Sequence, residues 1–234
     1  MSLPLGAAIA AAVLFGGLLQ GSVGVGFALV VSPVLALAAP GLLPGTVLIL
    51  MLPMNAFVAW RERRFVDRTG AAWITLGRCA GAFAGLAILA ALPAGSLRAF
   101  IGVATILSVG ASLMGGSFRL GRPVLLGAGL ITGITETATG IGGPPMALAY
   151  QHQPGPVLRA TLAACFLIGE VVSLVLLAAA GRLRGEQVVA AAWLLPALGL
   201  GVIGTRWLYG RLNGRPLRVA MLAFALVSGV VCLV

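Results

Sequence analysis

Long apolar stretches separated by short polar gaps dominate the hydrophobic pattern of this chain. An α-helix needs about 20 apolar residues to cross the hydrocarbon layer of a membrane. Six stretches come close to this length, at residues 44–60, 70–92, 97–115, 157–180, 187–208 and 216–234. The pattern therefore predicts an all-α polytopic membrane protein with these six transmembrane helices.

Two further apolar regions, residues 4–40 and 123–150, are interrupted by glycines near their middles. The second region has 28 residues, which would give about 42 Å of continuous helix at 1.5 Å per residue. Two complete crossings of about 30 Å each do not fit into that length. We therefore expect each region to form a hairpin of short or broken helices that turns inside the membrane, which is allowed where irregular backbone is buried in protein or lines a cavity.

The glycine-rich break of the first region recurs in the second region at one constant offset. The matched residues are Gly17, Gln20, Gly24, Val25 and Gly26 in the first region and Gly133, Glu136, Gly140, Ile141 and Gly142 in the second. Later matches follow in the same order and are Gly45–Thr46 with Ala160–Thr161, Asn55 with Glu170, and Ala71–Trp73 with Ala191–Trp193. The shared order predicts two homologous halves, residues 1–116 and 117–234, that together form one membrane domain.

Each half contains a hairpin, which crosses the membrane twice or not at all, and three spans, so each half crosses an odd number of times. The second half therefore starts on the opposite side of the membrane from the first, and the two halves have inverted topology. The basic residues, all of them arginine, agree with this parity. Ten fall in loops on one side and are Arg61, Arg63, Arg64, Arg68, Arg119, Arg122, Arg159, Arg211, Arg215 and Arg218. Only Arg98, Arg182 and Arg184 fall in loops on the other side. The positive-inside rule then predicts a multi-pass protein of the bacterial inner membrane with both termini periplasmic.

Composition narrows the function classes. The chain is 60% hydrophobic and only 9% charged, against roughly 25% charged residues in soluble domains. Its net charge of +10 follows from membrane orientation and does not indicate a nucleic-acid partner. Three isolated cysteines give no metal site, and no enzyme motif is present because the chain lacks lysine and contains a single aspartate. We expect no enzymatic activity and no cofactor.

The paired breaks suggest an anion-binding site. A helix N-terminus carries unpaired N–H groups and about half a positive charge, so two such ends aimed at one point can bind an anion without a cationic side chain. The candidate backbone positions are Gly24, Gly26, Gly140, Gly142 and Gly143, and the candidate hydroxyl donors are Ser22, Thr135, Thr137 and Thr139. The alternative is that these glycines only allow helices to pack closely.

Five polar side chains lie within apolar stretches, where such groups are costly and often functional. Gln20 either contacts the anion or satisfies the hairpin backbone. Arg78 either faces the anion or is held by a carboxylate or by snorkelling. Glu136, once protonated, suits coupling or gating, and the alternative is a structural carboxyl. Glu170 and Asn55 are further candidates for coupling or gating, and their alternative is pairing with neighbouring backbone or with Arg78.

The segment Gly140–Tyr150, with the sequence GIGGPPMALAY, and the following Arg159–Thr161 resemble the TauE/SafE family of membrane permeases. The family's glycine-rich motif stands as Thr139–Gly143 in the second half and as Gly21–Gly26 in the first, where Phe27 replaces a third glycine. The resemblance covers nearly the whole chain. It implies transport of small sulfur-containing anions, with sulfite export by alternating access as the expectation.

The resemblance leaves three alternatives open, namely a permease for sulfoacetate or another organosulfonate, a thiosulfate permease, and a passive anion channel. The expected partners are the sulfur anion and the lipid bilayer, with protons as coupling ions if Glu136 is protonated during transport.

Overall fold

A computed structural model describes residues 3–93, 96–113, 120–208 and 214–234 of the chain. Side chains are described for all of these except Leu3, Ser22, Val23 and residues 206–208 and 214–218. Arg119, Arg211 and the boundary between residues 116 and 117 lie outside the described residues, as do the side chains of Arg215 and Arg218.

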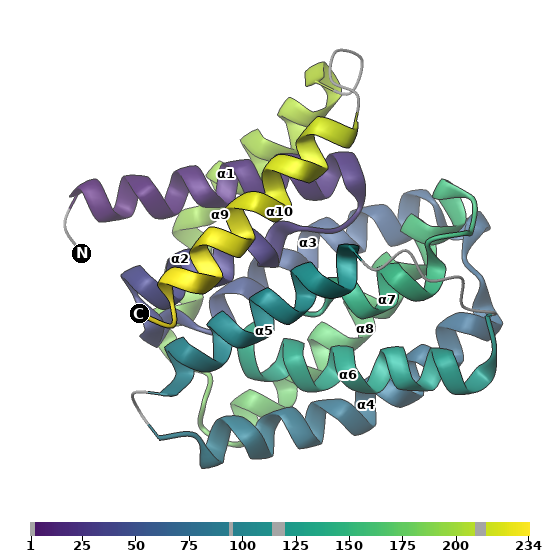
Figure 1. The fold of residues 1–234 in the computed structure, drawn as a ribbon, viewed down its shortest axis with the longest axis horizontal. Helices are drawn as coiled ribbons and strands as arrows, with labels where there is room; N and C mark the ends of the chain where they lie inside the picture. Colours follow the sequence, from purple (N-terminus) through teal and green to yellow (C-terminus); the bar gives the residue numbers. More distant parts are fainter. Residues whose placement is uncertain (1–2, 94–95, 114–119, 209–213) are drawn as a thin grey trace.

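The described residues form ten α-helices and two short 3-10 helices and contain no strand, which confirms the predicted all-α class (Figure 1). The elements are α1 (Leu3–Val23), α2 (Phe27–Ala38), η1 (Pro40–Leu42), α3 (Gly45–Arg61), η2 (Arg63–Phe65), α4 (Arg68–Ala91), α5 (Ser96–Leu113), α6 (Arg122–Thr139), α7 (Gly143–Tyr150), α8 (Gly155–Ala179), α9 (Gly185–Leu208) and α10 (Gly214–Val231).

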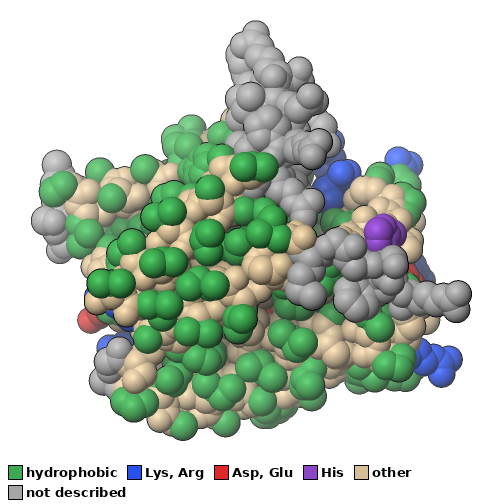
Figure 2. Space-filling view, in the orientation of Figure 1, with side chains coloured by type: hydrophobic (Ala, Val, Ile, Leu, Met, Phe, Trp, Pro, Cys, Tyr) green, Lys and Arg blue, Asp and Glu red, His purple; other side chains and the backbone are tan. Residues whose placement is uncertain are grey.

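Five of the described helices are long and apolar enough to cross a membrane. They contain the segments Pro4–Gly21, Arg68–Ala91, Ser96–Leu113, Gly155–Ala179 and Gly185–Thr205. Three shorter apolar helices cover Phe27–Ala38, Gly45–Arg61 and Val219–Val231. Two of the six predicted spans, 44–60 and 216–234, therefore correspond to shorter helices among the described residues, whereas α1, which we expected to be short or broken, is long enough to cross. Figure 2 shows apolar side chains over the visible face of the molecule and arginine side chains mainly toward its right-hand end. The chain is a multi-pass membrane protein.

Both glycine-interrupted regions are helical hairpins, as the sequence predicts, with breaks at residues 24–26 and 140–142. The returning helices are short: α2 has 12 residues and α7 has 8, so α7 is only about 12 Å long. The first helix of each hairpin is longer than we expected, with 21 residues in α1 and 18 in α6. Their internal glycines do not interrupt the helix, and several of them, including Gly17, Gly129 and Gly133, face neighbouring helices.

Glycines provide the closest helix contacts in the molecule. Along α4, a Cβ added to Gly77, Gly81 or Gly85 would strike main-chain atoms of α6. Gly129 and Gly133 of α6 meet the main chain of α4 in the same way. Small residues at such spacing let helix backbones approach closely in a membrane. The α4–α6 pair is therefore held backbone against backbone.

Helix pairing follows a regular exchange between α1–α5 and α6–α10. Helix α1 packs against α9 and α6 against α4, while α3 packs against α8 and α5 against α10. If the two halves are equivalent, α1–α5 correspond in order to α6–α10. The α1–α9 pair then corresponds to the α6–α4 pair, and the α3–α8 and α5–α10 pairs each correspond to themselves. The pairing agrees with the predicted inverted repeat, which stays a prediction. Both termini lie at the left in Figure 1, and the turns after α3 and α7 lie at the right.

Candidate functional site

The two breaks begin with the same backbone geometry and end differently, because Gly26 has a φ of 127° and Gly142 a φ of −131°. Gly24 and Gly140 adopt left-handed conformations, with φ angles of 87° and 81°. The N–H of Gly24 donates to the carbonyl oxygen of Gln20 at 2.8 Å, and the N–H of Gly140 donates to that of Glu136 at 2.7 Å. Glycine ends a helix in this way at the lowest conformational cost. The repeated motif thus places Gln20 and Glu136 one turn before each break.

Polar side chains beside the breaks hold the local backbone. The Oε1 atom of Gln20 accepts a hydrogen bond from the Phe27 N–H at 3.1 Å. In the second hairpin the Thr139 hydroxyl oxygen accepts from the Ile141 N–H at 3.1 Å, and the Thr132 hydroxyl donates to the Gly142 carbonyl at 3.0 Å. Gln20 therefore satisfies hairpin backbone. Thr132 was not singled out from the sequence, although it precedes Glu136 by one helical turn.

The remaining predicted hydroxyls lie elsewhere. Thr137 is hydrogen-bonded to Ser173 of α8, with 2.7 Å between the two hydroxyl oxygens. Thr135 is half-buried and donates to the Ile131 carbonyl of its own helix at 3.0 Å. Ser22 lies in α1, and its side chain is outside the described part of the chain. Of the three predicted threonines, the structure therefore brings only Thr139 directly to a break.

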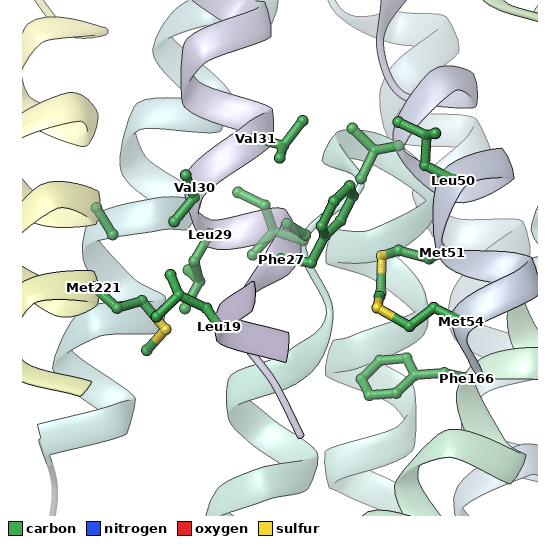
Figure 3. Close-up of a cluster of buried hydrophobic side chains, with 14 of the residues drawn as sticks. Leu19, Phe27, Leu29, Val30, Val31, Leu50, Met51, Met54, Phe166 and Met221 are labelled. Carbon is green, nitrogen blue, oxygen red and sulfur yellow. The ribbon is translucent and has the colours of Figure 1, made fainter. Parts of the chain in front are cut away.

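The two hairpin tips meet, but they leave almost no space between them. A Cβ added to Gly143 would lie 3.5 Å from the Cβ of Val25. Phe27 follows the first break directly and packs among buried apolar side chains that include Met51, Met54 and Phe166 (Figure 3). The cavity between the tips has a volume of about 10 Å³. This is room for one water at most and not for an anion with three oxygens.

Arg78 is buried in an ionic cluster and does not snorkel to the surface. It is 1% exposed, and its Nη2 atom forms an ion pair with Glu136 Oε2. Its guanidinium lies 4.9 Å from the centre of the Phe166 ring and against the backbone of Gly169. Its Nη1 atom is 3.8 Å from the sulfur of Met146. The structure shows the carboxylate-paired alternative for Arg78, and the anion-facing role stays a prediction.

Asn55 and Glu170, which the sequence matches across the repeat, are bonded to each other. The Asn55 Nδ2 group donates to Glu170 Oε1 at 2.7 Å, and both side chains are buried. Gly169, the residue before Glu170, lies directly against the guanidinium of Arg78, which pairs with Glu136. Four of the predicted residues, from α3, α4, α6 and α8, thus form one buried polar cluster.

A cavity of about 620 Å³ lies between α1, α3, α8 and α9. Its inner wall includes Gln20, Gly24 and Asn55, close to the first break. Its outer wall includes Arg61, Glu62 and Arg159, at the end of α3 and in the second turn of α8. The cavity therefore leads from the arginine-bearing end of the molecule toward the tip of the first hairpin.

Arg159 and Glu62 face each other in this cavity, and sequence reasoning did not assign either of them to a site. Arg159 Nη2 donates to Glu62 Oε1 at 3.0 Å. Both residues lie in short polar gaps, where Arg159 contributes to the positive-inside count and to the TauE/SafE-like motif. The available signal was Glu62, the one carboxylate within the run Arg61–Arg64. Among the described residues, no group of three His, Cys, Asp or Glu side chains could hold a metal ion.

Comparison with known proteins identifies the family. Curated proteins and solved structures give no match. The family model described as Sulfite exporter TauE/SafE matches residues 9–232, a span that includes both hairpins and the large cavity. This family consists of membrane transporters of sulfur anions such as sulfite. The chain, an integral membrane protein with two glycine-broken hairpins, therefore belongs to the TauE/SafE sulfite exporter family.

Proposed function

We propose that this protein is a secondary transporter of small sulfur-containing anions and that it exports sulfite by alternating access. The observation that carries the proposal is the cavity of about 620 Å³, which enters from the arginine-bearing end and stops at the first hairpin tip. Substrate sites between discontinuous helices are a recurring arrangement in secondary transporters. The proposed direction places the arginine-bearing end, and thus the cavity mouth, in the cytoplasm.

An asymmetry between equivalent helix pairs supports alternating access. Glycines join both equivalent pairs, Gly17 and Gly201 between α1 and α9 and Gly81 and Gly133 between α4 and α6. The cavity, however, is lined by α1 and α9 and not by α4 or α6. Leu198 lines the cavity and follows Trp193 by five residues, as Arg78 follows Trp73. Where Leu198 borders open space, Arg78 fills the corresponding place with its ion pair to Glu136. If the α1–α9 pair adopted the arrangement of the α4–α6 pair and the α4–α6 pair that of α1–α9, this cavity would close and an equivalent cavity would open toward the opposite end.

The membrane potential supplies a driving force for export. Sulfite at neutral pH is a mixture of the monovalent and divalent anions, and an inside-negative potential is worth about 2.3 kcal/mol per charge per 100 mV. Proton coupling is the alternative mechanism. Arg78, Glu136 and Glu170 carry a net charge of −1 when both carboxyls are ionised, and a buried net charge is costly. One proton makes this cluster neutral, so movement of that proton would accompany any opening of α4 from α6.

Flux measurements in liposomes test the proposal. Purified protein is reconstituted, and sulfite transport is followed under an imposed potential, with sulfoacetate and thiosulfate as competitors. We expect saturable sulfite flux that rises when the compartment at the arginine-bearing end is negative and filled with sulfite. Absence of flux for all three anions, in vesicles that contain folded protein, contradicts the proposal. Flux that rises with concentration without saturation indicates a passive channel.

An organosulfonate such as sulfoacetate is the second candidate substrate. The cavity volume of about 620 Å³ exceeds what sulfite alone requires, and it lies within the range of about 300–1,000 Å³ found for sites of larger organic ligands. If sulfoacetate inhibits the flux of labelled sulfite more strongly than the same concentration of unlabelled sulfite does, this candidate is favoured.

A further inference from the structure

The cationic side chain of Arg159 lies at the mouth of the large cavity and contacts two other parts of the fold. Arg159 comes from α8, and its guanidinium reaches Glu62 just beyond the end of α3, with 3.0 Å between Nη2 and Oε1. Its aliphatic stem lies over the first hairpin tip, because a Cβ on Gly24 would be 2.9 Å from Arg159 Cγ. Gly24 therefore leaves the space through which Arg159 reaches the cavity.

The charges that line the cavity favour an anion. Among its described lining residues, only Arg61, Glu62 and Arg159 are charged, which gives a net charge of +1. Glu62 compensates Arg159, and Arg61 is exposed at the same mouth. If the Glu62 carboxylate moved away, the mouth would present two guanidinium groups to a divalent ligand.

The Arg159–Glu62 pair is well suited to exchange. The two side chains are 29% and 21% exposed, and partly exposed ion pairs contribute little to stability. The second carboxylate oxygen, Glu62 Oε2, is buried without a hydrogen-bond partner. The carboxylate is thus held on one oxygen only, so its departure breaks few interactions.

A sulfur oxyanion can replace the carboxylate on the same guanidinium. Arginine presents a planar fork of N–H donors that binds two oxygens of a carboxylate or of another oxyanion. Sulfite and organosulfonates carry three oxygens on one sulfur, so two of them can accept from the fork while the third faces the cavity.

We propose that Arg159 is the residue that first binds the transported anion and that Glu62 occupies the same guanidinium when the anion is absent. The proposal rests on the transport function proposed above and assigns that function a binding residue and an internal competitor. Because Arg159 lies over Gly24, the bound anion is placed directly beside the first hairpin tip. Release of Glu62 at the same moment removes the ion pair between the end of α3 and α8.

Binding and transport measured on matched variants test this assignment. The variants are Arg159→Gln, Glu62→Gln and the double variant, and the control is Arg64→Gln, whose exposed guanidinium lies 4.7 Å from the Phe65 ring centre in the same loop and does not line the cavity. Sulfite affinity is measured by calorimetry on the purified protein in detergent, and KM is measured in liposomes. Thermal unfolding of each variant verifies that it is folded.

The two substitutions are expected to act in opposite directions. Arg159→Gln removes charge-assisted hydrogen bonds to the anion and should weaken sulfite binding by about tenfold or more. Glu62→Gln removes the competitor and should tighten binding by about threefold to tenfold. The double variant should bind as weakly as Arg159→Gln alone, because Glu62 competes only through Arg159. The control should bind sulfite like the wild type.

The outcomes separate this assignment from the transport proposal. Weaker or unchanged binding in Glu62→Gln, or unchanged binding in Arg159→Gln, overturns the assignment even if the wild type transports sulfite. Opposite effects on binding in a protein without flux support the site and overturn transport. A folded wild type that binds neither sulfite, sulfoacetate nor thiosulfate overturns the site.

Discussion

At the scale of single residues, Gln20 and Glu136 occupy equivalent positions and have different partners. Each precedes a left-handed glycine by four residues. Gln20 accepts from the Phe27 N–H, whereas Glu136 forms an ion pair with Arg78 of α4. The first hairpin is therefore fixed by a neutral hydrogen bond within itself, and the second is tied to a neighbouring helix by charge.

The Arg78–Glu136 pair predicts strongly non-additive effects of substitution. Replacing one partner leaves the other charge buried, which costs about 3–5 kcal/mol, whereas replacing both with apolar residues is often neutral or stabilising. We expect Arg78→Met and Glu136→Met each to lower the thermal unfolding temperature in detergent. The double variant Arg78→Met/Glu136→Met should unfold at a higher temperature than either single variant. Additive losses would show that the two groups do not stabilise each other.

Gly140 predicts a conformational penalty that a neighbouring glycine does not share. Gly140→Ala forces a side chain into a left-handed conformation, at a cost of roughly 1–2 kcal/mol, and places its Cβ 3.1 Å from Val47. Gly127→Ala, inside the helix that Gly140 ends, meets nothing within 4 Å. We expect unfolding at lower temperature for the first variant only. Equal unfolding temperatures of the two variants would exclude backbone strain at Gly140.

Residues close in sequence were easier to predict than residues brought together by the fold. The repeated motif identified Gly24 and Gly140 because the sequence itself carries the break. The partners of Arg159 and Arg78 are 97 and 58 residues away, and neither spacing has a signature. The bond between Asn55 and Glu170, 115 residues apart, was not predicted, because the sequence shows only that the two residues occupy matched positions in the two halves.

At the scale of elements, the α4–α6 contact depends on glycines that the sequence analysis did not single out. Gly77, Gly81 and Gly85 recur every four residues along one face of α4. Hydropathy identifies each span because it depends on a single helix. It does not indicate which spans touch, since that depends on small residues facing one another.

This contact predicts that a large side chain on α4 separates it from α6. In Gly81→Leu the new side chain meets the Leu130 carbonyl of the α6 main chain, and overpacking of this kind costs about 1–3 kcal/mol. We expect a lower unfolding temperature and reduced sulfite flux. Gly110→Leu, on α5, is the control because open space surrounds that position. Normal stability and flux in Gly81→Leu would show that the helices can separate freely.

At the scale of the whole molecule, the order of spans and hairpins was predictable because it follows from hydropathy and parity alone. The ten helices follow the predicted order, and the turns after α3 and α7 lie opposite both termini (Figure 1). The large cavity was not predictable, because its walls come from α1, α3, α8 and α9, which are far apart in the chain.

The predicted orientation can be measured by cysteine labelling in intact cells. Cys79, Cys165 and Cys232 are replaced by alanine, and a single cysteine is introduced at Arg64 or at Val234, both of which are exposed. A membrane-impermeant maleimide should label Val234→Cys from outside and Arg64→Cys only after the cells are opened. Labelling of Arg64→Cys from outside would reverse the proposed orientation.

The Arg159–Glu62 pair also bears on discrimination among ordinary anions. A carboxylate tethered beside its guanidinium competes at a local concentration of the order of millimolar, whatever the bulk solution contains. Chloride has one charge and no pair of oxygens, so it gains little by displacing that carboxylate, whereas a divalent oxyanion gains two aligned hydrogen bonds. An anion must displace the Glu62 carboxylate in order to bind, and this requirement selects against chloride. We therefore expect chloride to inhibit sulfite transport by Glu62→Gln more strongly than transport by the wild type.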